Sequence, residues 1–115
     1  MLVRSSPQRL LRVKENFPKL RIIAAHFGGF RLWQEVEELL LGKDIYLDTS
    51  FFFDYLPKEK IKSLILKHRE DRLLFGTDFP LIDQNKDIDY LQGLGLPGEL
   101  TERIFFLNSR ELLGL

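Results

Sequence analysis

Two short segments contain the residues whose types and spacing are best suited to chemistry. Residues 24–29 read AAHFGG and include His26, and residues 75–80 read FGTDFP and include Asp78. Each segment follows an apolar run typical of a buried strand, so each ionisable side chain lies where a strand ends. In parallel α/β proteins this edge of the sheet is where ligands and catalytic groups collect. The two segments therefore predict part of an active site.

His26 has two interpretations. An imidazole near neutral pH serves as a general base, a general acid or a metal ligand. Gly28 and Gly29 would then let the backbone turn sharply and let a substrate approach. The alternative is a buried histidine that is hydrogen-bonded to a backbone carbonyl, and the spacing alone does not decide between the two.

Asp78 is a candidate ligand for a divalent cation or a group that orients a water molecule. The alternative is a turn aspartate that caps the following segment. Asp48 and Ser50 occupy the matching end of the middle strand. They would contact a ligand, support His26 and Asp78 or, as the residue types favour, satisfy loop amides. Phe79 joins them and the two glycines as a candidate residue of the substrate pocket. The aromatic run 51–53 would line an apolar pocket, contact another chain or, as is most common, pack within its loop.

The elements that must position these residues alternate between helix and strand. Apolar runs predict strands, and stripes with helical spacing predict helices. His68 is expected to interact with the carbonyls that end its helix, and Asn108 with Glu111 resembles a capping box. The predicted strands are 20–26, 44–50 and 72–76, and the predicted helices begin at Pro7, span 31–41, begin at Pro57, and cover 88–91, 100–106 and a last short helix that ends at Gly114. This order predicts an α/β fold with three parallel strands, in one domain of residues 1–115.

Composition narrows the classes of function. The 115 residues contain 17 Lys plus Arg and 17 Asp plus Glu, so net charge gives no reason to expect nucleic acid or a membrane surface as a partner. Cysteine is absent, which excludes disulfides and thiolate metal sites. No apolar run approaches the length of a membrane span and no secretory leader precedes the first helix, so a cytoplasmic protein is expected.

The two segments and several others, taken together, resemble the C-terminal part of the amidohydrolase-related TIM-barrel family. This family contains metal-dependent hydrolases, lactonases and decarboxylases similar to aminocarboxymuconate-semialdehyde decarboxylase. The resemblance covers nearly the whole chain in order. The matching stretches are SPQRL (6–10), FPKLRIIAAHFGG (17–29), IYLDTS (45–50), LFGTDFP (74–80) and residues 108–115.

The resemblance implies a (β/α)8 barrel of which this chain supplies the sixth to eighth strands. It implies that His26 acts in proton transfer or metal binding, that Asp78 binds a divalent metal, most simply zinc, and that a metal-activated water acts on a small carbonyl substrate. The family's His-x-His pair and its fifth-strand histidine have no counterpart, since His26 and His68 are the only histidines. The chain is then either a fragment of such an enzyme or an inactive remnant that oligomerises or binds a partner.

Three strands of an eight-stranded barrel also predict association. An open parallel sheet leaves two edges and one apolar face uncovered. We therefore expect a homo-oligomer that forms through the sheet edges or the barrel face.

Overall fold

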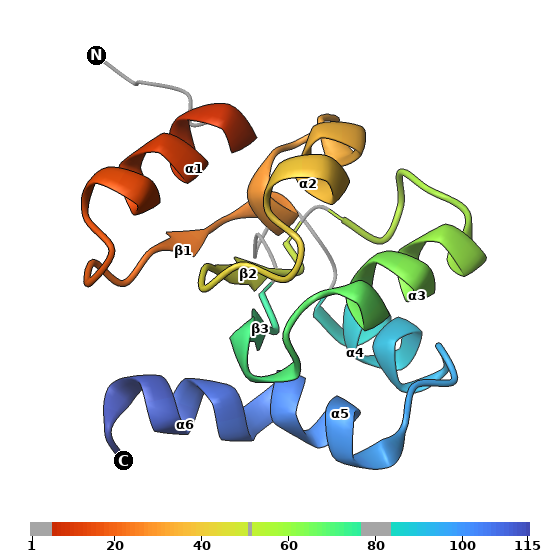
Figure 1. Ribbon diagram of the computed structural model, residues 1–115. Helices are drawn as coiled ribbons and strands as arrows, with labels where there is room; N and C mark the ends of the chain where they lie inside the picture. The colour runs from red at the N-terminus through yellow and green to blue at the C-terminus, as the bar shows by residue number, and fades with distance from the viewer. Residues whose placement is uncertain (1–5, 51, 77–83) are drawn as a thin grey trace.

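Three short parallel strands form the centre of the structure, a computed structural model that describes residues 6–50, 52–76 and 84–115. They lie side by side in the order β1-β2-β3 (Figure 1). Because all three run in the same direction, their carboxyl ends meet at one edge of the sheet. The predicted α/β class with three parallel strands is confirmed. The strands are β1 (Ile23–Ala24), β2 (Tyr46–Asp48) and β3 (Leu73–Leu74).

The regular strands are shorter than the apolar runs that predict them. β1 stops because the backbone turns into the left-handed region at His26 and Phe27, whose φ angles are 55° and 51°. A residue in that region cannot continue a strand. An apolar run therefore predicts a buried segment. Only the part of that segment that lies before the turn pairs with the neighbouring strand.

The helices begin close to the predicted positions. The helix α1 (Pro7–Asn16) is capped by Ser6, whose hydroxyl accepts a hydrogen bond from the Arg9 amide at 3.2 Å. The helices α2 (Trp33–Leu39) and α3 (Lys58–Lys67) follow β1 and β2 respectively. The ammonium group of Lys60 lies 2.8 Å from Glu37 Oε1, so these two helices also lie next to each other.

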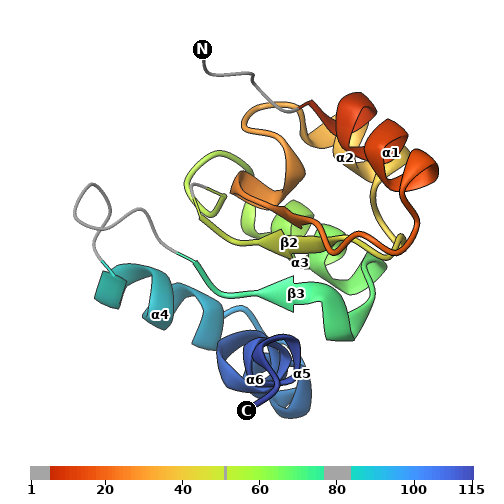
Figure 2. The ribbon, with the colours of Figure 1, turned by 90° about the vertical axis from the view of Figure 1, so that its left-hand side faces the viewer.

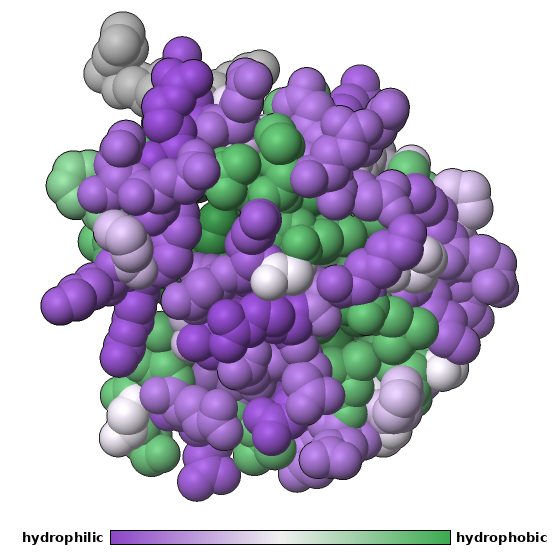
Figure 3. All heavy atoms as spheres, in the orientation of Figure 1, coloured by the Kyte–Doolittle hydropathy of each residue, from purple (hydrophilic) through white to green (hydrophobic). Residues whose placement is uncertain are grey.

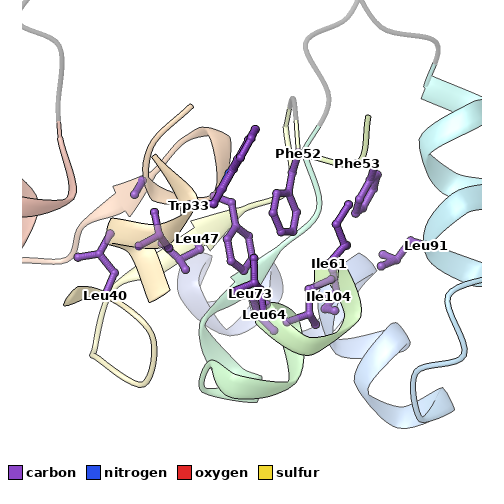
Figure 4. Packing of buried hydrophobic residues seen from close by; sticks show 14 of the residues in the cluster. Trp33, Leu40, Leu47, Phe52, Phe53, Ile61, Leu64, Leu73, Leu91 and Ile104 are labelled. Atoms are coloured by element: carbon purple, nitrogen blue, oxygen red, sulfur yellow. The ribbon is translucent and has the colours of Figure 1, made fainter. Parts of the chain in front are cut away.

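One apolar core joins the sheet to α2 and α3 (Figure 4). Phe27 from the turn after β1 stacks on Phe52 with the ring centroids 4.1 Å apart, and Phe53 stacks on Tyr90 at 4.5 Å. Phe52 and Phe53 are buried, so for these two rings packing within the core is the correct interpretation. Phe51 lies outside the described residues. The predicted stripe of α2 is buried in the same core, together with side chains of α3 and the strands: Trp33, Val36, Leu40, Leu47, Ile61, Leu64, Ile65 and Leu73.

The C-terminal residues form one continuous helical rod rather than two separate helices. After α4 (Gln84–Gln92), the rod consists of α5 (Gly98–Glu102), a π-helical turn at Arg103–Leu107, and α6 (Asn108–Leu113), which Gly114 ends at a φ of 74°. The predicted capping box is wrong, because Asn108 has helical backbone angles and is fully buried.

Asn108 instead fixes the rod to the outer edge of β3. Its amide nitrogen donates to the carbonyl oxygens of Glu70 at 2.7 Å and Leu73 at 2.8 Å. The Phe75 amide donates to the carbonyl oxygen of Ile104 at 3.0 Å. Leu74 faces β2, since its carbonyl accepts from the Thr49 amide, so the backbone groups of its two neighbours face outward.

The rod lies beside β3, as Figure 2 shows. It binds the Leu73 carbonyl oxygen and the Phe75 amide on the side that a further strand would use. The expectation of two uncovered edges is wrong for β3. It still applies to β1, the other end of the sheet, where Ile23 is 54% exposed.

The face of the molecule shown in Figure 3 is mostly hydrophilic, with apolar patches between the charged side chains. Near β1 the exposed apolar side chains include Phe17 and Leu20. Within the described residues, no helix has the length and apolar character needed to cross a membrane.

Candidate functional site

His26 lies in a left-handed turn directly beyond the carboxyl end of β1. The φ angles of His26 and Phe27 place both residues in a region that costs an L-residue about 1–2 kcal/mol. Gly28 continues the turn at a φ of 89°, and a Cβ there would lie 2.7 Å from Leu40 Cδ1. Glycine is therefore required at position 28 for both conformation and space. Strain of this kind persists only where surrounding contacts hold it.

Those contacts come from the end of β2. The His26 amide donates to Asp48 Oδ1 at 3.1 Å and to Ser50 Oγ at 3.2 Å. The ring Nδ1 of His26 lies 3.0 Å from Ser50 Oγ and 3.4 Å from the Ser50 carbonyl oxygen. Asp48 and Ser50 thus bind both the backbone and the ring of the histidine.

Asp48 is the centre of this group. Its Oδ1 also accepts from the Ser50 amide at 3.0 Å and from the Ser50 hydroxyl at 2.5 Å. Ser50 is buried, whereas Asp48 and His26 are partly exposed. The expectation that Asp48 and Ser50 satisfy loop amides is confirmed, and the same two residues also hold the candidate catalytic histidine.

The end of β3 joins the group through Gly76. The Gly76 amide donates to Thr49 Oγ1 at 3.2 Å, and the Thr49 hydroxyl lies 3.3 Å from the Gly76 carbonyl oxygen. A Cβ on Gly76 would lie 3.2 Å from Asp48 Cγ, so a larger residue would crowd Asp48. Asp78 and Phe79, the two candidates that follow Gly76, lie outside the described residues.

Aromatic side chains stand beside His26. Phe30 makes an edge contact with the imidazole at 6.1 Å between centroids, and it contacts Tyr55 at 5.0 Å. Arg31 places its guanidinium 5.3 Å from the centre of the Phe30 ring. This aromatic surface adjoins the site, whereas Gly28 is buried against the core and Gly29 is buried with its Cβ position 3.1 Å from Pro7. A role of these glycines in substrate approach stays a prediction.

The described residues do not assemble a metal centre by themselves. No group of three His, Cys, Asp or Glu side chains capable of holding a metal ion occurs in the described ranges. A catalytic zinc site generally uses three protein ligands. His26 supplies one donor of a suitable type, and Asp48 Oδ1 is already bound by three N–H or O–H groups.

His68, the other histidine, lies at the opposite end of the sheet. Its Nε2 is 2.8 Å from the carbonyl oxygen of Ile45, the residue before β2, and its Nδ1 accepts from the Gly42 amide at 3.1 Å. Burial lowers the pKa of this imidazole. The expected contact with the carbonyls that end α3 is wrong, because the ring bonds to the segment that leads into β2.

Sequence reasoning missed two parts of this site. It did not assign Thr49 to the link between β2 and β3. It also gave support of His26 by Asp48 and Ser50 only as an alternative, and it did not identify which atoms of His26 they bind. The available signal was the Asp-x-Ser spacing at a strand end, since side chains two apart in an extended segment share a face.

A family model described as Amidohydrolase matches residues 7–115. The chain belongs to the amidohydrolase family. The match covers every described element and agrees with the resemblance inferred from the two segments. No curated protein sequence matches the chain.

Solved structures show the same fold as part of larger chains. A dihydroxybenzoic acid decarboxylase from a Polaromonas species, with bound manganese and the inhibitor 2-nitroresorcinol, is 21% identical with a TM-score of 0.72. An uncharacterized TIM-barrel protein from Bordetella bronchiseptica is 21% identical with a TM-score of 0.74. A probable 2-pyrone-4,6-dicarboxylic acid hydrolase from Acinetobacter baumannii, with citric acid bound, is 19% identical with a TM-score of 0.69.

This chain spans only part of those structures. The matches cover 95%, 94% and 96% of this chain but 39%, 39% and 50% of the respective relatives. The three strands and their helices therefore correspond to part of a TIM barrel. The assignment of these strands as the sixth to eighth stays a prediction.

Proposed function

We propose that this chain contributes the proton-transfer side of an active site in a metal-dependent hydrolase or decarboxylase that acts on a small carbonyl compound. The observation that carries the proposal is His26. It is held in a strained left-handed turn at the carboxyl end of β1 by Asp48 and Ser50. Family membership supports the reaction class, and the solved relatives include both a decarboxylase and a hydrolase.

In hydrolysis, His26 would accept a proton from the attacking water as the water oxygen bonds to the carbonyl carbon. It would return that proton to the leaving oxygen or nitrogen as the old bond breaks. In decarboxylation, His26 would deliver a proton to the carbon that loses carbon dioxide. Both reactions require an imidazole that changes its charge near neutral pH.

Asp78 is proposed as a ligand of the divalent metal, with His26 beside it as a further ligand or as the proton-transfer group. Such a metal, when bound, polarises a carbonyl and acidifies water. The described residues alone contain no group of three potential ligands. Zinc is proposed by resemblance, whereas the Polaromonas relative contains manganese, so the metal itself must be measured.

The proposal is tested on the purified protein by metal analysis after dialysis, followed by assays with lactones and 2-hydroxybenzoates. We expect bound zinc or manganese, and a fall in kcat of about 10²–10⁴-fold for His26→Asn. Asp78→Asn should lose the metal. His68→Gln is the matched control and should keep both metal and activity. Activity that survives His26→Asn would contradict the assignment.

The second candidate is a non-catalytic module that associates through the open edge of β1. One observation favours it: the side chain of Ile23 on the terminal strand is 54% exposed. A protein without bound metal or activity that forms a stable oligomer by light scattering would support this candidate.

A further inference from the structure

We propose that Ser50, fixed by Asp48, holds His26 in the tautomer with the proton on Nδ1, so that Nε2 is the unprotonated nitrogen of the neutral ring. Ser50 and Asp48 are thereby positioning residues for the histidine. The use of Nε2 in catalysis rests on the proposed function, whereas the tautomer itself follows from the hydrogen bonds alone.

The argument begins with the shortest contact. Ser50 Oγ lies 2.5 Å from Asp48 Oδ1, so a proton must lie between the two oxygens. An ionised carboxylate carries no proton and only accepts. The proton therefore belongs to the Ser50 hydroxyl, which donates it to Asp48.

The hydroxyl then has no proton left for His26. A serine oxygen provides one donor and two acceptor positions. Both acceptor positions are occupied by His26, through its backbone N–H at 3.2 Å and through Nδ1 at 3.0 Å. Since Oγ accepts at this contact, Nδ1 must donate.

The second neighbour of Nδ1 gives the same answer. The Ser50 carbonyl oxygen, 3.4 Å away, can only accept a hydrogen bond. Both groups near Nδ1 thus require an N–H at that position. When the ring is neutral, the lone pair used to accept a proton or to bind a metal is then on Nε2.

His68 provides an internal reference with the opposite tautomer. The Gly42 amide donates to its Nδ1, and its Nε2 faces the Ile45 carbonyl oxygen. His68 therefore carries its proton on Nε2. Because the two histidines are expected to have opposite tautomers, the signals of His68 serve as the reference for those of His26 in the same sample.

The test is two-bond 1H–15N correlation NMR of the 15N-labelled protein at pH 8. We expect a pyrrole-type shift for Nδ1 and a pyridine-type shift for Nε2 of His26, with the reverse pattern for His68. A pyrrole-type Nε2 at His26 in the wild-type protein would overturn the proposal, and this measurement needs no variant.

Variants distinguish the hydrogen-bond relay, which runs from His26 Nδ1 to Ser50 Oγ and from Ser50 Oγ to Asp48 Oδ1, from simple packing of Ser50 against the ring. Ser50→Ala removes the hydroxyl contact and leaves only the longer contact of Nδ1 with the backbone carbonyl oxygen at 3.4 Å. The His26 shifts should therefore move part of the way towards the Nε2-protonated tautomer, and the His68 shifts should stay unchanged. Ser50→Thr, which keeps the hydroxyl, should restore the wild-type pattern. If Ser50→Ala leaves the His26 shifts unchanged while the His68 pattern reports a folded protein, the relay is wrong.

Asp48→Asn tests the role of the carboxylate separately. Its amide oxygen should stay in place, because the amides of His26 and Ser50 both donate to that position. The His26 tautomer should therefore be retained. A reversed tautomer in this variant would show that position 48 does not accept the serine proton. These outcomes are independent of activity, so failure of the relay and failure of the proposed function are distinguishable.

Discussion

His26 and His68 are the same residue type placed at opposite ends of one sheet. His26 follows β1 at the carboxyl end, is partly exposed, and is bound by the side chains of Asp48 and Ser50. His68 lies near the amino end of β2, is 6% exposed, and is bound by two backbone groups. Both ring nitrogens of His68 are bound by the backbone, so this ring is part of the fold. The His26 ring is bound at Nδ1 by Ser50 and is only partly buried, so it is oriented and still accessible for chemistry.

The largest effect should come from removing the buried ring. His68→Ala leaves the Gly42 amide and the Ile45 carbonyl without their partner and opens a cavity. We expect a loss of about 3 kcal/mol in the free energy of unfolding. Urea denaturation at pH 7.5 measures it, and a loss no larger than that of His26→Asn would remove the distinction between the two histidines.

The next effect is a dependence of stability on pH. Burial lowers the pKa of His68 in the folded protein, so the unfolded chain binds more protons between that pKa and the ordinary value of about 6.5. The stabilising contribution is complete above about pH 6.5 and is lost as the pH falls through this window.

Urea midpoints at pH 7.5 and pH 5.5 should therefore differ more for the wild-type protein than for His68→Gln, which keeps a donor and an acceptor but does not titrate. Equal pH dependence in the two proteins would assign the effect to other groups.

A smaller decrease in the free energy of unfolding is expected for a substitution at the carboxyl end of the sheet. Ser50→Ala removes one hydroxyl from the group around His26, and we expect a decrease of about 1 kcal/mol in the free energy of unfolding. Ser50→Thr is the control because it keeps the hydroxyl. A loss as large as that of His68→Ala would mean that the Ser50 hydroxyl is as important to the fold as the buried ring.

The smallest change should follow from His26→Asn. Asparagine tolerates a positive φ better than most residues, and its backbone N–H keeps the contacts with Asp48 and Ser50. We expect a stability change within about 0.5 kcal/mol. A much larger loss in thermal or urea unfolding would place His26 with His68 as a structural residue.

The sequence predicted the features that depend on local pattern. The stripe of Trp33, Val36 and Leu40 gave a correct helix face, and Ser6 gave a correct helix start, because both depend on residues within a few positions. The three parallel strands and the position of His26 at a strand end also followed from the alternation of strands and helices. The amidohydrolase resemblance rested on these same segments and is confirmed by the family match.

The features that failed depend on contacts between distant segments. Asn108 resembles a helix cap by its spacing to Glu111, yet it lies inside a helix, where its side-chain nitrogen donates to the carbonyl oxygens of Glu70 and Leu73. His68 likewise bonds across to Ile45. The left-handed turn at His26 is not encoded by local preference, since Asp48 and Ser50 from the next strand hold it.

The C-terminal rod has a consequence for assembly. Because Asn108 and Ile104 bind the Leu73 carbonyl oxygen and the Phe75 amide on the outer side of β3, a further strand would join the described sheet more easily beside β1. If two copies paired through β1 about a twofold axis, their β1 strands would run antiparallel. The combined sheet would then have a C-terminal rod beside β3 at each of its two ends. Growth through strand pairing would then be self-limiting, with a closed pair in place of a fibre.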